Sequence, residues 1–358
     1  MKSLFQEIED LNSWDYYDRD EKCEIPYWND NSKHQEFIKN FLKISRKELV
    51  ESHFFTNELR DAGISFNNFE RATHTNSVFF IGSLLYEKLL LKDKINFVRE
   101  DGKDDEFHFI WFLTSLVHDF GYFAEKYKSK FSYVTEDIAS LNLTHNLLDF
   151  DTGSRYLNEA YDEYKSSTKL IINEIPNYFK EAFNGKRSSR GESKIEHGIY
   201  AGLLLYDGLV KNRIERKEQQ KNGVEEGLYW KDDLDKFYAI ASFAIAIHNM
   251  RRDGIVENPE DLKFSIEDEP FLFLFALADT IEPIKTYGNE NPEDVLKNIL
   301  IDVQEDKIIL QNASDSKLDF SEQAKKVCNL ASWMDVKVCN EGNTLTIKIN
   351  NKFKDSKK

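Results

Sequence analysis

Cysteine and proline are both scarce in this sequence, and each shortage limits the folds that are open to it. The three cysteines, Cys23, Cys328 and Cys339, lie far apart and form no Cys-x-x-Cys pair, which argues against a disulfide framework or a cysteine zinc site. Only six prolines occur among 358 residues, so long helices are allowed. We therefore expect a chain that folds without disulfides in a reducing, cytoplasmic compartment.

Long apolar runs are missing as well. No uninterrupted apolar stretch approaches the length of about eighteen residues that indicates a membrane-spanning helix. The N-terminus reaches Glu7 before an apolar core of signal-peptide length develops. We expect neither a membrane span nor export.

Positive charge is outnumbered, because 48 Lys and Arg residues face 64 Asp and Glu residues, which gives a formal net charge of -16. A surface of this sign repels polyanions, so nucleic acid is disfavoured as the main partner. The sequence also lacks the motifs Gly-x-x-x-x-Gly-Lys, Gly-x-Gly-x-x-Gly, Gly-x-Ser-x-Gly and His-Glu-x-x-His. Their absence argues against a nucleotide-cofactor enzyme and against a serine hydrolase.

Most of the chain has apolar residues at intervals of three and four, the spacing of amphipathic helices. The clearest helical stretches are Val78–Leu91, Phe107–Val117, Ile199–Val210, Phe237–Ile247 and Phe271–Ala278. The last two are apolar on nearly all sides, which indicates helices at the centre of a bundle. Residues 130–183 have helical patterning of their own, so we expect a helical insertion or lid there.

The C-terminal part has the pattern of a small α+β appendage. Residues 307–310 resemble a short strand, and a helix is predicted over Ser321–Met334 with Ser321 as its cap. A hairpin is predicted within residues 336–349, with Gly342 in its turn.

These patterns together predict a mainly α protein. We expect a helical extension over residues 1–66, a helical bundle domain over residues 67–291 that contains the insertion, and the α+β appendage over residues 292–358.

Four histidines and two aspartates stand in or beside the apolar helical segments: His74, His118, Asp119, His197, His248 and Asp279. A single histidine on an apolar face is more often a hydrogen-bonded core residue than a metal ligand. Two aspartates at the ends of apolar helices are different, because burying an ionised carboxylate costs several kcal/mol unless a cation or donors compensate it. The set therefore indicates a metal site, and its mixture of imidazole and carboxylate suits Fe, Mn, Co, Ni or Zn.

The order of these residues resembles that of the HD superfamily of metal-dependent phosphohydrolases. The motif Arg71-x-x-His74 is similar to the opening seen in several HD branches, and His118-Asp119-x-Gly121 resembles the family's His-Asp-x-Gly core. The resemblance covers residues 67–283. It implies that the predicted helical bundle is an HD domain.

The resemblance also implies how the candidate ligands divide. His74, His118, Asp119 and Asp279 would hold one metal ion, and Asp119 would bridge to a second ion held by His197 and His248. Family members with only the first four ligands often bind a single ion. One or two divalent transition-metal ions are therefore expected, and the additional histidines favour two.

Cationic side chains that hold phosphate oxygens are a further expectation from the family. Candidates at helical spacing from the ligands are Arg71, Lys126, Arg251 and Arg252. Lys126, together with Asp119, is the candidate for a catalytic role, and the three arginines are candidates for substrate binding. The alternative for each cation is a structural one, because such side chains often only cap a helix or pair with a carboxylate.

Two further residues adjoin candidate ligands. Tyr122 is a candidate substrate contact, and Tyr122 and Glu196 are both placed to orient a neighbouring imidazole. Tyr122 is equally compatible with a role in the core.

The expected activity is hydrolysis of a phosphoester of a small molecule by a metal-activated hydroxide, with nucleotides or cyclic nucleotides as the leading substrate class. Two alternatives remain. A minor HD branch uses the same four histidines and two aspartates to hold two irons for an oxygenase reaction, and a third possibility is a nucleotide-binding regulatory module. A homo-oligomer is compatible with all three.

Overall fold

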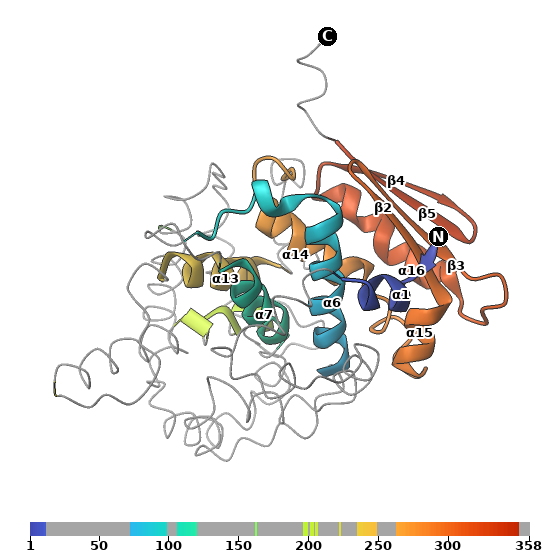
Figure 1. Ribbon diagram of the computed structural model, residues 1–358, viewed down its shortest axis with the longest axis horizontal. Coiled ribbons are helices and arrows are strands. Elements are labelled where there is room, and N and C mark those ends of the chain that lie inside the picture. Colours follow the sequence, from blue (N-terminus) through green and yellow to red (C-terminus); the bar gives the residue numbers. More distant parts are fainter. Residues whose placement is uncertain are drawn as a thin grey trace, which may run out of the picture. The chain divides into compact units, whose positions relative to one another are not determined.

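The chain divides into two compact units. The first unit consists of Met1–Phe54, Ser65–Asn96 and Asn258–Lys358, and the second consists of Phe55–Ile64 and Phe97–Glu257. The computed structural model (Figure 1) describes residues 1–11, 72–98, 106–119, 162, 196–199, 201–203, 205–206, 222, 235–248 and 263–350.

Helices make up the larger part of the described residues. The α-helices are α1 (Leu4–Glu9), α6 (Ala72–Lys88), α7 (Phe107–Val117), α13 (Asp235–Ile247), α14 (Pro270–Ile281), α15 (Pro292–Asn298) and α16 (Phe320–Cys328). Two short 3-10 helices are η1 (Leu91–Asp93) and η6 (Asn329–Ser332). The helices that the apolar spacing predicts around residues 78–91, 107–117, 237–247 and 271–278 are thus confirmed. The ends of α7 agree with the prediction, and those of the other three differ by up to six residues.

The first unit contains an antiparallel sheet of five strands in the order β1-β2-β3-β5-β4. The strands are β1 (Lys2–Ser3), β2 (Ile299–Gln304), β3 (Lys307–Asn312), β4 (Val336–Glu341) and β5 (Thr344–Ile349). Figure 1 shows α15 and α16 beside this sheet. Alternate residues of β3 and β5 are buried, and this period of two is typical of a sheet with one face against a core.

The sheet overturns the expectation of a mainly α protein. Among the described residues 54% are helical and 18% are in strands, which is a mixed α/β content. Two strands were missed. β1 has only two residues, and its pairing of Lys2 with Ile301 depends on a segment some three hundred positions away. β2 follows α15 directly, and its run of Ile299, Leu300 and Ile301 does not by itself distinguish a strand from a buried helix.

Two other predictions for the C-terminal part, the hairpin and the strand, are confirmed. β4 and β5 form the expected hairpin, and Gly342 in its turn has a φ of +69°, a conformation that favours glycine. The predicted strand at 307–310 lies within β3. The predicted cap at Ser321 is wrong, because the side chain of Asp319 caps α16 by accepting from the Ser321 backbone N–H.

In each unit a pair of packed helices ends at candidate ligands. In the first unit α6 contacts α14, and in the second unit α7 contacts α13. Every described side chain of α13 from Phe237 to Ile247 is buried, and α14 is buried along most of its length. The apolar helices therefore fix the ends from which the polar ligands project.

None of the helices in the described part of the chain combines the length and the apolar character needed to cross a bilayer.

Candidate metal centre

Three candidate histidine ligands of the second unit surround the carboxylate of the fourth, Asp119. Oδ1 of Asp119 lies 3.5 Å from Nε2 of His118, 3.5 Å from Nε2 of His197 and 3.9 Å from Nε2 of His248. All four side chains are buried. We refer to Asp119, His118, His197 and His248 as the second-unit set.

Two of these imidazoles are oriented by the last turn of their own helix. His118 follows α7 and directs Nδ1 to the Ser115 carbonyl oxygen at 2.7 Å. His248 follows α13 and directs Nδ1 to the Ile245 carbonyl oxygen at 2.6 Å. Carbonyls in the last turn of a helix lack an intrahelical donor, so they are available to accept from a ring N–H. In both neutral rings the proton therefore lies on Nδ1.

His197 is oriented by a carboxylate. Its Nδ1 lies 2.8 Å from Oε1 of Glu196, while Oε2 of Glu196 accepts from the backbone N–H groups of Gly198 and Ile199. This side chain holds the adjacent imidazole, as its position in the sequence suggested, and it also caps the start of this helical segment. Burial alone would raise the pKa of Glu196, but the neighbouring His197 and His248 and its hydrogen bonds lower it to about 2.

The protons on the Nδ1 atoms leave the Nε2 lone pairs facing inward. Nε2 of His197 lies 3.3 Å from Nε2 of His248, and both face the Asp119 carboxylate. With both protons on Nδ1, the two ring nitrogens and the carboxylate oxygen are all electron-pair donors at distances that a cation among them would stabilise. The ligand atoms of Asp119, His197 and His248 all lie within 4.8 Å of one another, which suits a single ion.

Two glycines allow the helical segment that follows His197 to approach α13 closely. A Cβ on Gly198 would lie 2.6 Å from the Ile245 carbonyl oxygen and 2.8 Å from Nδ1 of His248. A Cβ on Gly202 would lie 2.5 Å from the Ser242 carbonyl oxygen. The two helical segments therefore pack closely at this pair. The same approach brings His197 and His248 together.

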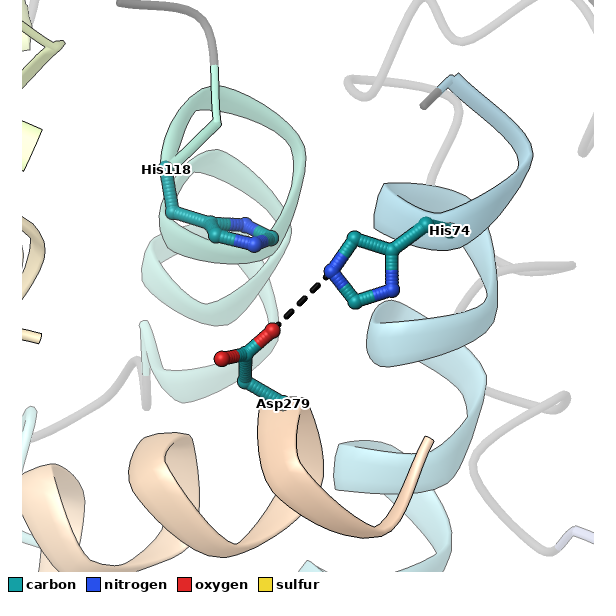
Figure 2. A group of neighbouring side chains, drawn as sticks. All are labelled: His74, His118 and Asp279. Carbon is teal, nitrogen blue, oxygen red and sulfur yellow. Dashed lines mark ion pairs between the residues drawn. The ribbon is translucent and has the colours of Figure 1, made fainter. Parts of the chain in front are cut away.

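The two candidate ligands of the first unit, His74 and Asp279, form an ion pair. Figure 2 shows His74 of α6 and Asp279 of α14 pointing toward one another, with Nε2 of His74 2.9 Å from Oδ1 of Asp279. On its other side the His74 ring directs Nδ1 to Oε2 of Glu282 at 2.5 Å. His118, also drawn in Figure 2, follows α7 and belongs to the second unit. We refer to His74 and Asp279 as the first-unit pair.

Glu282 contacts Nδ1 of His74 in the same way as Glu196 contacts Nδ1 of His197. It is fully buried, and its carboxylate also accepts from the backbone N–H groups of Ile284 and Lys285. Burial alone would raise the pKa of Glu282, but His74, Lys326 and the hydrogen bonds lower it. A carboxylate behind a ligating imidazole fixes the ring and increases its basicity, which is a common arrangement in metal sites.

Two lysines next to the first-unit pair were not foreseen. Nζ of Lys285 lies 3.4 Å from Nε2 of His74 and 3.6 Å from Oδ1 of Asp279. Nζ of Lys326 donates to the carbonyl oxygens of Asp279 and Glu282. Lys285 stands six positions after Asp279, a spacing that gives no helical signal because α14 ends at Ile281.

All six predicted ligands lie in the described part of the chain, and five of them are buried while Asp279 is partly exposed. These histidine and aspartate groups could hold a metal ion. Their nitrogen and carboxylate donors suit a divalent transition metal. The remaining predicted site residues lie outside the described residues: Arg71, Tyr122, Lys126, Arg251 and Arg252.

No family model, no curated protein and no solved structure matches this chain, so its functional assignment depends on its own residues.

Proposed function

We propose that this chain is a metal-dependent phosphohydrolase of the HD type, which hydrolyses a phosphoester of a small molecule such as a nucleotide or cyclic nucleotide. The observation that carries the proposal is the second-unit set, in which three imidazoles direct Nε2 toward one buried carboxylate. A purely structural histidine cluster would not need every ring turned toward the same charged oxygen.

The proposed ligand assignment follows the resemblance in the sequence. His74, His118, Asp119 and Asp279 hold one divalent ion, and Asp119 bridges to a second ion held by His197 and His248. The first-unit pair places His74 beside Asp279. The second-unit set places Asp119 beside His197 and His248.

Bound divalent ions would supply a nucleophile from water near neutral pH and would neutralise charge on the phosphate. The chain's own residues prepare this chemistry. Glu196 and Glu282 hold two of the imidazoles in the tautomer that leaves Nε2 available, and the carbonyls of Ser115 and Ile245 do the same for the other two. The ligands therefore need little reorganisation when an ion arrives.

Substrate binding is proposed for residues near the ligands in sequence. Arg71, Arg251 and Arg252 would hold the phosphate oxygens, Tyr122 would contact the substrate, and Lys126 would assist Asp119 in catalysis. The acidic net charge of -16 favours a small substrate over a polyanion.

The test combines metal analysis with turnover. The full chain, loaded with Mn²⁺ or Fe²⁺, is assayed against a panel of nucleotides, cyclic nucleotides and other phosphoesters. Asp119→Asn is assayed beside it, with Asp302→Asn, at a partly exposed position of β2, as the control. We expect about two ions per chain and phosphate release in the wild type and the control, and loss of both in Asp119→Asn.

Two results would redirect the proposal. Retained iron with O₂-dependent turnover of an organic substrate, and no phosphate release, would select the di-iron oxygenase. Tight nucleotide binding without turnover under any metal would select the regulatory module.

A further inference from the structure

Strand β4 forms one edge of the five-stranded sheet, because β5 is its one strand neighbour among the described residues. Its last three residues, Cys339, Asn340 and Glu341, are exposed, and so is Lys337. An exposed edge strand presents backbone N–H and C=O groups with which another strand can pair. A further strand could therefore be added to the sheet at β4.

The hydrogen bonds of the hairpin determine which residues of β4 face this edge. The backbone N–H of Asn350 donates to the carbonyl oxygen of Asp335 on the opposite side of the hairpin. Hydrogen-bonded and non-hydrogen-bonded pairs alternate along an antiparallel ladder. Val338 and Asn340 lie an odd number of positions after Asp335, so their backbone groups point away from β5 and toward the edge.

The exposed side chains of β4 have a charge order that is complementary to itself. Lys337, Cys339 and Glu341 lie on one face of the strand, the face opposite to that of the buried Val336. In an antiparallel copy centred on Cys339, Lys337 of each strand lies opposite Glu341 of the other, and Cys339 lies opposite Cys339. The same alignment joins the two strands through the backbone groups that face the edge.

Neighbouring registers lack this match. A shift by one residue aligns Val338 with a residue whose backbone groups point to β5. A shift by two residues places Lys337 opposite Cys339 or Asn343 instead of Glu341. Charged side chains on an edge strand usually prevent pairing, and on β4 their order permits it in one register.

Lys337 also has an unfavourable neighbour within its own chain. It lies directly opposite Lys348 of β5, and like charges at directly opposite positions of two strands are destabilising. A carboxylate on the other side of Lys337, supplied by a second β4 strand, would offset this repulsion.

We infer that this chain forms a symmetric homodimer through its β4 edges, in which two antiparallel β4 strands join the two sheets and the Lys337–Glu341 pair occurs twice. The partner is a second copy of this chain. Pairing of one strand with another buries little surface, so the dimer forms reversibly and depends on concentration. The inference is independent of the proposed function, because it involves no metal ligand and no substrate contact.

Sedimentation of the full chain over a range of concentrations tests the dimer. Lys337→Glu alone and Glu341→Lys alone should each weaken dimerisation by about tenfold or more, because each dimer loses two opposite-charge pairs and gains two like-charge contacts. The double variant Lys337→Glu/Glu341→Lys should restore it. An equimolar mixture of the two single variants should form heterodimers, because one chain then presents only carboxylates and the other only ammonium groups.

Thermal unfolding of Lys337→Glu separates dimerisation from folding. The new carboxylate lies opposite Lys348 of the same chain, so the hairpin should be at least as stable as in the wild type although the dimer is weakened.

Cys339 reports the register. Opposite residues of a non-hydrogen-bonded pair have Cα atoms about 4.5 Å apart, which is within the range of disulfides. Oxidised glutathione should therefore join two chains through a Cys339–Cys339 disulfide, with release of two molecules of reduced glutathione. Cys23→Ser/Cys328→Ser, which keeps Cys339, should form this product. Cys23→Ser/Cys339→Ser, which keeps the exposed Cys328, is the control and should not.

Three results would overturn the inference. The first is a chain that stays monomeric at every concentration. The second is a dimer that neither single charge variant weakens, and the third is a dimer that oxidised glutathione does not link through Cys339. Absence of metal binding or of phosphoester turnover would count against the proposed function and leaves this test intact.

Discussion

At the scale of single residues, the chain controls which ring nitrogen of each histidine is available. Glu196 and Glu282 each use their carboxylate twice, once for an imidazole Nδ1 and once for backbone N–H groups in the next two or three residues. His118 and His248 instead use a carbonyl oxygen three residues earlier. In all four histidines, which come from different elements, Nδ1 thereby faces a carboxylate or carbonyl oxygen.

Replacement of Glu196 by glutamine should reverse the tautomer of His197. The amide oxygen of glutamine can still accept from Gly198 and Ile199, but the amide N–H₂ would then face Nδ1, which must accept and leaves the proton on Nε2. We expect metal affinity at the second-unit set to fall by about 10- to 100-fold. Metal affinity by chelator competition and histidine ¹⁵N shifts would measure both effects.

Glu293→Gln is the control for this change, because Glu293 is a partly exposed residue of α15 that pairs with Lys297. Unaltered metal affinity in Glu196→Gln would show that His197 does not bind metal through Nε2.

Some of these site residues could be predicted from the sequence and others could not. Asp119 and His248 could be predicted because a polar residue at the end of an apolar helix stands out in the sequence. Glu196 could be predicted because it adjoins His197. Glu282 and Lys285 could not, because their importance depends on His74, which is more than two hundred positions away and meets them only through the packing of α6 on α14.

At the scale of elements, the distance between helices decides whether the ligands meet. Gly198 and Gly202 lie on the helical segment that packs against α13, and both leave no room for a Cβ. Only Gly198 is also close to a ligand, because its missing Cβ would touch Nδ1 of His248. Alanine substitutions at the two positions can therefore distinguish an effect on helix packing from a direct effect on the His248 ring.

Gly198→Ala and Gly202→Ala should each destabilise the chain by about 1–3 kcal/mol, the usual cost of forcing a methyl group into a packed contact. Gly198→Ala should weaken metal binding much more than Gly202→Ala, since it displaces the His248 ring and its hydrogen bond to Ile245 directly. Urea unfolding of the metal-free proteins and Mn²⁺ titration would separate the two effects. Equal loss of metal affinity in both variants would contradict this account.

In the first unit, Tyr287 joins the turn that follows α14 to the start of α16. Its hydroxyl donates to the carbonyl oxygen of Asp319, the residue that caps α16. Burial raises the pKa of Tyr287 from 10.0 to about 12, with smaller contributions from Asp319 and Glu322. The folded state therefore favours the protonated tyrosine, and this stabilisation is complete below pH 10 and is lost as the pH rises toward 12.

Tyr287→Phe should lower the free energy of unfolding by about 0.5–1.5 kcal/mol at neutral pH, because the hydrogen bond to Asp319 is lost. The difference between wild type and variant should shrink between pH 10 and pH 12. Urea unfolding across this range measures it, and the other tyrosines cancel because both proteins share them. A difference that grows with pH would rule out the raised pKa.

At the scale of the whole molecule, the sequence predicted the helices and the C-terminal hairpin but not the complete sheet. Helices and hairpins depend on residues that are close in the sequence, so their periodicity is visible there. β1 pairs the second and third residues of the chain with β2, and only the folded chain brings these segments together. The mixed α/β content follows from such long-range pairing, which a local pattern cannot reveal.

The buried ligands also make the stability of the whole chain depend on metal. Asp119 and Glu196 lie in one buried set with inward-facing imidazoles, an arrangement that is costly without a cation. A metal ion that binds only the folded state stabilises it by about 2.7 kcal/mol at a concentration one hundred times its dissociation constant. Chelation should therefore lower the thermal unfolding temperature of the wild type.

Asp119→Asn should change the unfolding temperature in opposite directions without and with metal. Without metal it should unfold at the same temperature as the chelated wild type or higher, because the repulsion within the second-unit set is relieved. With saturating Mn²⁺ it should unfold at a lower temperature than the wild type, because it gains little from the ion. Thermal unfolding of both proteins, with chelator and with Mn²⁺, measures the four temperatures. Two outcomes would mean that Asp119 is a structural residue and that this set holds no ion. In one, chelator does not change the unfolding temperature of the wild type. In the other, Asp119→Asn lowers the unfolding temperature by the same amount with chelator and with Mn²⁺.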